Sequence, residues 1–253
     1  PESRFYRYWA TSCTDCGPRF SVVEALPYDR PRTAFRDFPM CPDCARDYQN
    51  PLDRRYHAQT IACPRCGPKL FFIVEGQEVP GDPIALAQKA LREGKILAIR
   101  GLGGTHLACD ATREGVVTEL RRRLARPAQP FALMAREDQI PLFSEPTEKE
   151  WELLRSPRRP IVVLLHRPGD LAPSVAPGLH TVGVMLPYTG LHHLLLRGLP
   201  FPLVMTSANF PGRPMLIEND RILRELSHVA DAFLLHNRRI EARCDDSVLR
   251  LGP

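Results

Sequence analysis

Six of the eight cysteines lie in the first 66 residues, in three pairs whose members are two residues apart. These pairs are Cys13 and Cys16, Cys41 and Cys44, and Cys63 and Cys66. A tight Cys-x2-Cys turn aims two thiolates at one metal ion, and two such turns complete a tetrahedral structural zinc site. A disulfide framework needs an oxidising compartment, and the sequence opens without a secretion leader. We therefore expect zinc ligands rather than disulfides.

An internal repeat with an offset of 50 residues indicates which cysteines share an ion. The residues that recur at this offset are Pro1, Arg4, Tyr6, Cys13, Cys16, Gly17 and Pro18. In the complete copy, an eighteen-residue loop separates Cys41 and Cys44 from Cys63 and Cys66, so we expect these four to bind one zinc ion. By the same offset, the partners of the first pair would lie before Pro1, and only half of that finger is expected here.

Two other arrangements stay open. The first and second cysteine pairs can share an ion across twenty-four residues, which leaves the third pair without a partner. His57 lies in the loop of the complete copy and can replace a thiolate, although a packed or solvated histidine is commoner. Four thiolates leave no open position for water or substrate, so the zinc is expected to be structural. The aromatic residues near the knuckles either dock RNA or protein or form a small core, and we favour the core.

Three loops that follow or precede apolar segments form the candidate site, the first two suited to anions and the third, at 244–247, to a metal ion or a nucleotide hydroxyl. The glycine turn at 100–104 lets a phosphate or small acid approach the backbone. Residues 206–209, Thr-Ser-Ala-Asn, offer two hydroxyls and an amide, and residues 244–247 offer Asp245, Asp246 and Ser247. No nucleotide P-loop motif occurs. On sequence grounds, plain turns and helix caps explain the same residues equally well.

The elements that must position these loops alternate between helices and apolar strands. Helices are expected at 84–91, 114–124, 148–155, around 192–193 and at 219–229. Strands are expected at 96–99, 131–134, 161–165, 182–186, 203–205, 233–235 and 248–249. Asp82 suits a helix N-cap, with Pro83 at the first helical position. The pattern predicts an α/β fold with a twisted, mostly parallel or mixed sheet, whose ligands gather at strand ends.

Composition agrees with a small domain followed by a larger one. The chain has 253 residues, 43% of them apolar and 25% charged, and no apolar run approaches the roughly 18 residues of a membrane span. The polar Gly/Pro stretch at 75–83 predicts a linker, so we expect a zinc-finger-like region at 1–74 and a second domain at 82–253. We expect a cytoplasmic protein without membrane contact. A net charge of +5 is weak support for nucleic-acid binding.

Several motifs together resemble the HypF family of hydrogenase maturation carbamoyltransferases. They lie at 54–59 (RRYHAQ), 103–111 (GGTHLACDA), 126–134 (RPAQPFALM), 185–189 (MLPYT), 192–195 (HHLL), 205–209 (MTSAN) and 236–248 (HNRRIEARCDDSV). The resemblance covers nearly the whole chain. It implies a zinc-finger region joined to a YrdC-like domain, lacking the acylphosphatase-like and Kae1-like domains of that family.

The resemblance also implies a reaction. In the intact protein, carbamoyl phosphate would yield carbamate, the YrdC-like domain would join carbamate to ATP as carbamoyl adenylate, and the carbamoyl group would pass to the C-terminal cysteine of a HypE-type partner. That group later becomes a cyanide ligand of the nickel-iron hydrogenase. The alternatives are an RNA- or protein-binding module without catalysis, and a threonylcarbamoyl adenylate synthase of the same fold.

The site residues follow from the Lys-x-Arg and Ser-x-Asn elements of YrdC-type domains. By resemblance, Arg126, Ser207 and Asn209 are expected to be catalytic and to line a cationic hollow that binds ATP with Mg²⁺. The further nucleotide-binding residues expected are Thr206, Ser247, Arg123 and Arg243, with Gly103 and His106 at the carbamate end. Leu124 and Gln129 stand where the family has lysines. Losing two cations weakens neutralisation of the phosphates unless the neighbouring arginines compensate.

Overall fold

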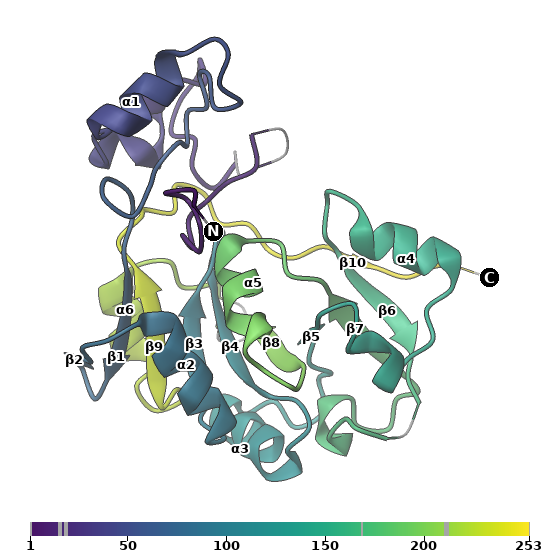
Figure 1. Ribbon diagram of the computed structural model, residues 1–253. Helices are drawn as coiled ribbons and strands as arrows, with labels where there is room; N and C mark the ends of the chain where they lie inside the picture. Colours follow the sequence, from purple (N-terminus) through teal and green to yellow (C-terminus); the bar gives the residue numbers. More distant parts are fainter. Residues whose placement is uncertain (1, 15–16, 18–19, 168, 210–212, 253) are drawn as a thin grey trace.

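A wide twisted sheet forms the centre of the molecule, with helices on both faces and the cysteine-rich region beyond the strand ends (Figure 1). This computed structural model describes residues 2–14, 17, 20–167, 169–209 and 213–252. The helices are α1 (Pro42–Gln49), α2 (Pro83–Arg92), α3 (Glu114–Leu124), α4 (Glu148–Arg155), α5 (Gly190–Arg197) and α6 (Asn219–Glu225). The strands are β1 (Leu70–Val74), β2 (Gln77–Glu78), β3 (Leu97–Arg100), β4 (Thr105–Asp110), β5 (Leu133–Met134), β6 (Ile161–Leu165), β7 (Thr181–Met185), β8 (Leu203–Ser207), β9 (Ala232–His236) and β10 (Val248–Leu249).

The sheet is mixed, with strand order β10-β6-β7-β5-β8-β4-β3-β9-β1-β2. The parallel pairs are β10 with β6, β3 with β9, and β5 with β7, and the other pairs are antiparallel. The α/β class is therefore confirmed, and of the two sheet types expected, the mixed one is correct. Because β3 and β8 both run antiparallel to β4, their carboxyl ends lie at the same edge as the start of β4.

The local signals in the sequence place several helices accurately. Asp82 caps α2, its carboxylate accepting a hydrogen bond from the Ile84 N–H at 3.0 Å, an interaction worth about 1 kcal/mol. The expected spans at 114–124 and 148–155 agree with α3 and α4, and a capping box between Thr147 and Glu150 starts α4.

Strands β1, β2 and β4 and helix α1 went unpredicted. Strand β4 lies between the expected glycine turn and the expected helix at 114–124, where no element was predicted, and it pairs with strands on both sides. Helix α1 starts at the first knuckle of the complete finger. The expected linker at 75–83 contains β2, and β1 pairs with both β2 and β9. The sheet therefore includes residues that we expected to belong to the zinc-finger region and the linker.

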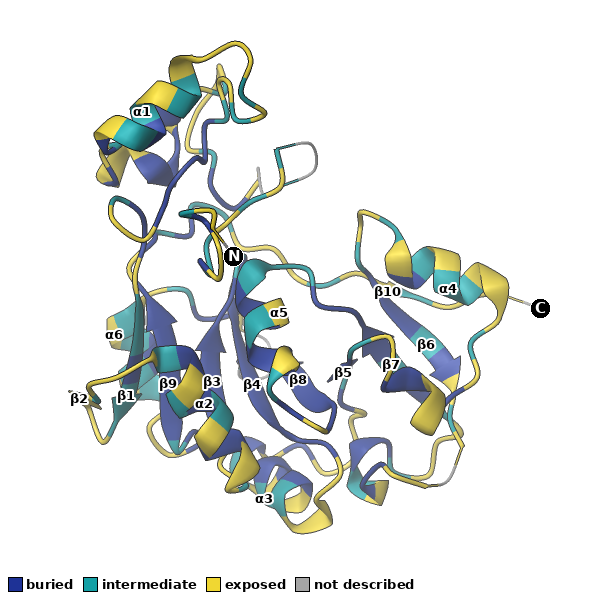
Figure 2. Cartoon of the chain, viewed as in Figure 1, coloured by how far each residue is buried: buried dark blue, intermediate teal, exposed yellow. Residues whose placement is uncertain are grey.

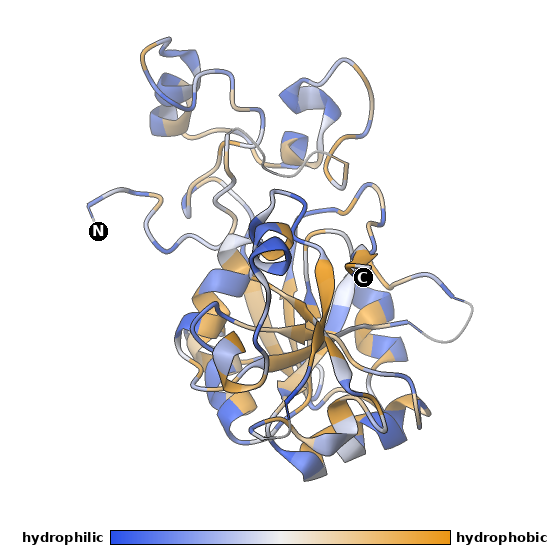
Figure 3. Cartoon of the chain, turned by 90° about the vertical axis from the view of Figure 1, so that its right-hand side faces the viewer, coloured by the Kyte–Doolittle hydropathy of each residue, from blue (hydrophilic) through white to orange (hydrophobic). Residues whose placement is uncertain are grey.

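The core is divided by the sheet into two apolar layers. Alternate strand residues point to opposite faces, so Leu97 and Ile99 face α2 and α5 while Ala98 faces α3. Figure 2 shows the central strands buried and the outer helix faces exposed, and Figure 3 shows hydrophobic residues concentrated in the strands of the sheet. Both faces of these strands are covered, which explains their continuous apolar sequences. No helix among the described residues is long and apolar enough to span a membrane.

Candidate functional site

The four cysteines of the complete finger converge on one point. Their sulfur atoms lie within 4.8 Å of one another, and Cys63 Sγ is 3.8 Å from the sulfurs of both Cys41 and Cys66. Sulfurs at about 2.3 Å from a tetrahedral zinc ion are about 3.8 Å apart, so the spacing fits zinc. Cys41 caps the start of α1, and the N–H of Gly67 bonds the Cys63 carbonyl at 2.8 Å to close the second knuckle. The four cysteines that were expected to share one zinc ion are therefore grouped as expected.

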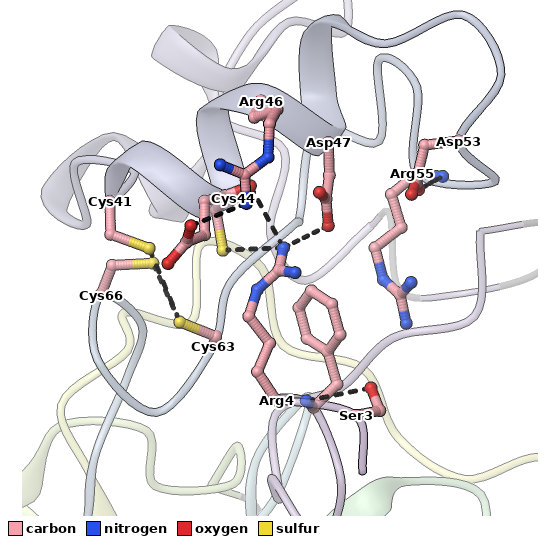
Figure 4. A network of polar contacts seen from close by, with 12 residues as sticks. Ser3, Arg4, Cys41, Cys44, Arg46, Asp47, Asp53, Arg55, Cys63 and Cys66 are labelled. Atoms are coloured by element: carbon pink, nitrogen blue, oxygen red, sulfur yellow. Dashed lines mark hydrogen bonds and ion pairs between the residues drawn. The ribbon is translucent and has the colours of Figure 1, made fainter.

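A cation compensates the charge that four thiolates bring to this site. The Arg4 guanidinium lies 3.8 Å from Cys44 Sγ and also forms an ion pair with Asp47 (Figure 4). Four thiolates around one Zn²⁺ leave a net charge of −2, which this guanidinium partly offsets. A zinc ion held by all four thiolates would have no open position for water or substrate.

The other metal-ligand alternatives are not assembled here. His57 stacks on Tyr48, with ring centroids 5.0 Å apart, and does not belong to the four-sulfur group. Cys13 is exposed and lies at the wall of a separate cavity. Cys16 lies outside the described residues. The alternative that joins the first and second cysteine pairs is therefore wrong, because the second pair is already grouped with the third.

A cavity of about 600 Å³ lies between the cysteine-rich region and the sheet. Its walls include Trp9 from the first region and Gly103, Tyr188, Asp246 and Ser247 from the second. The ring of Trp9 stacks on His236 at 5.0 Å between centroids, and its Nε1–H donates to the Pro68 carbonyl at 3.1 Å. The zinc-finger region therefore contributes one wall of the cavity as well as its own metal site.

The Gly103 turn and the 244–247 loop fit closely together. The Cys244 N–H donates to the Gly103 carbonyl at 3.1 Å, and a Cβ at Gly103 would lie 2.6 Å from Cys244 Cβ and 2.7 Å from its carbonyl oxygen. Only glycine permits this approach of two backbones. Two of the three loops expected to form the site, 100–104 and 244–247, thus meet at the cavity wall.

Arg126, Ser207 and Asn209 are brought together by the ends of α3 and β8. Arg126 follows α3, and its Nη2 donates to the Asn209 side-chain oxygen at 3.0 Å, while Nη1 donates to Thr206 Oγ1 at 3.3 Å. The Ser207 hydroxyl donates to Asn209 Oδ1 at 2.8 Å. Burial lowers the pKa of Arg126, and no described carboxylate pairs with it. The group therefore holds a buried positive charge without an acidic partner.

His106 and Asp246 form a second polar group, at the cavity. His106 Nε2 lies 2.9 Å from Asp246 Oδ2, and its Nδ1 is buried without a partner among the described residues. The Tyr188 hydroxyl interacts with the same carboxylate. Burial of Asp246 opposes ionisation, but the hydrogen bond and charge of His106 outweigh it, and the pKa of Asp246 is lowered. Burial raises the pKa of Tyr188, and the neighbouring Asp246 raises it further.

The strand register makes these two groups neighbours. His106 on β4 lies directly opposite Ser207 on β8. Side chains of directly opposed residues lie on the same face of a sheet, with their Cβ atoms about 5 Å apart. The described lining of the cavity includes Asp246 but none of His106, Arg126, Ser207 and Asn209. The basic group is therefore connected to the cavity wall only indirectly, through His106 and its contact with Asp246.

Two further expected residues lie apart from these groups. Arg123 pairs with Glu119 and Asp231 at 2.8 and 2.7 Å, on the outer side of α3. Arg243 donates to the Met215 carbonyl at 2.8 Å. Neither has a described contact with Arg126.

The positions where the family has lysines are also explained. Leu124 is buried in the core below α3, as its apolar spacing predicted. Gln129 is exposed.

Sequence reasoning missed the pairing of His106 with Asp246 and the wall that Trp9 provides. Asp246 was noted only as a turn former or as a ligand of a metal or nucleotide hydroxyl, and His106 only as part of the glycine segment. The partners are 140 residues apart, and no local periodicity connects them. Tyr188 and Asp246 both lie in motifs that carried the family resemblance, and this was the one available signal in the sequence.

Comparison with known proteins agrees with this architecture. The Sua5/YciO/YrdC family model, described as "Telomere recombination", matches residues 89–253, and the model described as "HypF finger" matches residues 1–23 and 40–73. The carbamoyltransferase HypF of Rhodobacter capsulatus is 52% identical over all of this chain and 34% of its own length. The probable carbamoyltransferase HypF of Methanocaldococcus jannaschii is 52% identical over 98% of this chain and 33% of its own length.

A solved structure shows the same fold. Full-length HypF, crystallised in the phosphate- and nucleotide-bound form, matches 99% of this chain and 33% of its own, with 47% identity and a TM-score of 0.95. The chain spans about a third of the length of these relatives. The chain therefore belongs to the Sua5/YciO/YrdC family and, with its HypF finger, is homologous to the HypF carbamoyltransferases over its whole length.

Proposed function

We propose that this chain joins carbamate to ATP, forming carbamoyl adenylate and releasing pyrophosphate. The observation that carries the proposal is the register of β4 and β8, which sets His106 opposite Ser207 and so connects the Arg126 group, through His106, to Asp246 at the cavity wall. Kinship with proteins named carbamoyltransferases, and with one HypF solved in a nucleotide-bound form, supports this reaction class.

The reaction requires two anions to be held together. One carboxylate oxygen of carbamate forms a bond to the α-phosphorus of ATP, and the bond from that phosphorus to the oxygen bridging to the β-phosphate breaks. Pyrophosphate leaves with the electron pair, and no net proton transfer is needed. Catalysis therefore depends on positioning and on charge stabilisation rather than on acid-base chemistry.

Arg126, Ser207 and Asn209 are the residues we assign to the phosphates. Arg126 supplies a fixed positive charge, which the Thr206 hydroxyl and Asn209 hold in place. The Ser207 hydroxyl and the Asn209 amide are neutral donors at the same end of β8. Preorganised groups of this kind act on developing charge without reorganising during the reaction.

Mg²⁺ would arrive with ATP and bridge its phosphates. With Leu124 in the core and Gln129 without charge, neutralisation of the phosphates rests more heavily on this ion and on Arg126. We place Gly103 and Ser247 along the cavity wall next to the acyl group and the α-phosphate. We do not assign Arg123 and Arg243 to the phosphates, because Arg123 forms an ion pair with Asp231 and Arg243 donates to the Met215 carbonyl.

The wider role is also a proposal. In a longer protein, carbamate would come from carbamoyl phosphate, and a HypE-type partner would accept the carbamoyl group on its C-terminal cysteine in the cytoplasm. We assign zinc a purely structural role and ATP with Mg²⁺ the chemistry. The unit boundaries that we propose remain 1–74 and 82–253, with β1 serving as the connection that enters the sheet.

Calorimetric titration with Mg-ATP, followed by pyrophosphate release with fresh ammonium carbamate, tests the function. We expect binding, and release that depends on carbamate. Arg126→Ala is expected to weaken ATP binding roughly 10- to 100-fold, as for the loss of a charged hydrogen-bonding group. The matched control is Arg122→Ala, because Arg122 is exposed and pairs only with Glu119 among the described residues.

The outcomes separate the alternatives. Salt-dependent RNA binding without ATP binding would identify a nucleic-acid module instead. Pyrophosphate release that requires threonine and bicarbonate would identify a threonylcarbamoyl adenylate synthase. Equal ATP affinity in Arg126→Ala and Arg122→Ala would remove Arg126 from the site.

A further inference from the structure

Asp246 is a half-buried acceptor that faces the cavity and is not needed for binding phosphates. Its side chain keeps 20% of its surface exposed, and Asp246 lines the cavity wall, while the side chain of its partner His106 is only 4% exposed. A carboxylate repels phosphate, so Asp246 does not fit the nucleotide end of the site. An ionised carboxylate accepts hydrogen bonds and donates none. Its free lone pairs therefore call for a ligand group that carries N–H or O–H.

The surroundings of Asp246 keep it ionised and fixed in orientation. His106 Nε2 lies 2.9 Å from Oδ2, and Tyr188 interacts with the same carboxylate. The His106 ring packs beside Gly101, where a Cβ would lie 3.5 Å from Nδ1, so the ring has little freedom to turn away. The Gly103 to Cys244 backbone contact holds the loop that carries Asp246. These contacts fix the carboxylate before any ligand binds.

Carbamate is the small carboxylate whose other end matches this acceptor. Its two carboxylate oxygens must face the α-phosphorus and cationic groups, and its amino group carries two N–H donors on the opposite side. Arg158 and Arg159 line the same cavity and offset the negative charge of the two carboxylates. Acetate has the same carboxylate but presents a methyl group, which would leave the half-buried Asp246 acceptor without a donor from the ligand.

We propose that Asp246, oriented by His106 and Tyr188, accepts a hydrogen bond from the amino group of carbamate and thereby selects carbamate over carboxylic acids without an N–H donor. The assignment rests on the adenylation function proposed above and names its specificity-determining residue. A site built to accept a hydrogen bond from a substrate N–H discriminates strongly against an analogue without that N–H. This discrimination is much stronger than that of an apolar pocket against a substrate that lacks one methylene group.

Asp246→Asn tests this assignment with little change of shape. We expect its KM for carbamate, measured by ATP–pyrophosphate exchange, to rise roughly 10- to 100-fold, because one hydrogen bond to a charged group is lost. We expect the dissociation constant for ATP to change less than twofold, and the preference for carbamate over acetate to fall by the same factor as the KM rises. Asp138→Asn is the matched control, since that carboxylate is 68% exposed and pairs with Arg136.

Tyr188→Phe is a second variant that tests the assignment if Asp246→Asn unfolds or no longer binds ATP. It removes only the hydroxyl beside the carboxylate, and we expect a smaller rise in the KM for carbamate with ATP affinity unchanged. If the soluble variants keep the wild-type KM and the wild-type preference over acetate, the assignment is overturned while the proposed function stands. If the wild-type chain itself neither binds ATP nor exchanges pyrophosphate, the proposed function fails first.

Discussion

Gly103 is the position at which adding a single methyl group tests whether two backbones really meet at the cavity. In Gly103→Ala the new Cβ would lie 2.6 Å from Cys244 Cβ and 2.7 Å from the Cys244 carbonyl oxygen. Backbone atoms cannot move aside as the end of a flexible side chain can. Overpacking of this kind costs about 1–3 kcal/mol, and loss of the 3.1 Å bond from the Cys244 N–H adds about 1 kcal/mol.

The expected total is about 2–4 kcal/mol, or roughly 6–12 °C in melting temperature for a chain of this size. Moving the 244–247 loop outward relieves part of this strain, but the same movement displaces Asp246 and Ser247 from the cavity wall. If the loop moves in this way and the full loss of stability is avoided, Gly103→Ala is therefore expected to lower the affinity for ATP or carbamate. Urea denaturation and calorimetric titration of one preparation measure both effects.

Gly115→Ala is the matched control in the same domain. Gly115 is exposed on α3, and a Cβ there would meet nothing within 4 Å. Alanine in place of a helical glycine is expected to stabilise by about 0.5–1 kcal/mol. If Gly103→Ala has wild-type stability and wild-type affinity for both ligands, the close contact between the two loops is refuted.

Three more changes test other parts of the molecule. Cys63→Ser should reduce bound zinc from one ion per chain to almost none by elemental analysis, with a lower melting temperature, since structural zinc contributes folding energy; unchanged zinc content would contradict the four-cysteine site. Burial lowers the pKa of His192 to about 3, below its unfolded value of 6.5, so the protein loses stability as the pH falls below 6.5. Between pH 7 and pH 5, urea titrations should show that His192→Phe loses roughly 2 kcal/mol less free energy of unfolding than the wild type does. Equal losses in the two proteins would refute the buried neutral state of His192. Trp9→Leu removes the stack on His236 and the hydrogen bond to the Pro68 carbonyl. The free energy of unfolding should therefore fall by roughly 1–3 kcal/mol, and the affinity for ATP should also fall. Unchanged ATP affinity would exclude this wall of the cavity from the site.

Much of the local structure was predictable because it depends on neighbours in sequence. The apolar spacing at 114–124 gives α3, and the Asp82-Pro83 cap gives the start of α2. Strand β4 was missed, since its buried residues include Thr105, His106 and Asp110 and do not form a simple apolar run. Its strand geometry comes from pairing with β3 and with β8, and β8 lies far from it in sequence.

The sequence alone predicted which four cysteines group together, because the Cys-x2-Cys turns set each pair of thiolates locally and the 50-residue repeat favours one combination of pairs. It also identified Ser207, Asn209 and Arg126 through the family motifs. Only the tertiary structure decided that His106 faces Ser207 and that Asp246 reaches His106 across 140 residues. Register and loop contact depend on which apolar faces pack together over the whole sheet, and that long-range choice leaves no periodic signal in the chain.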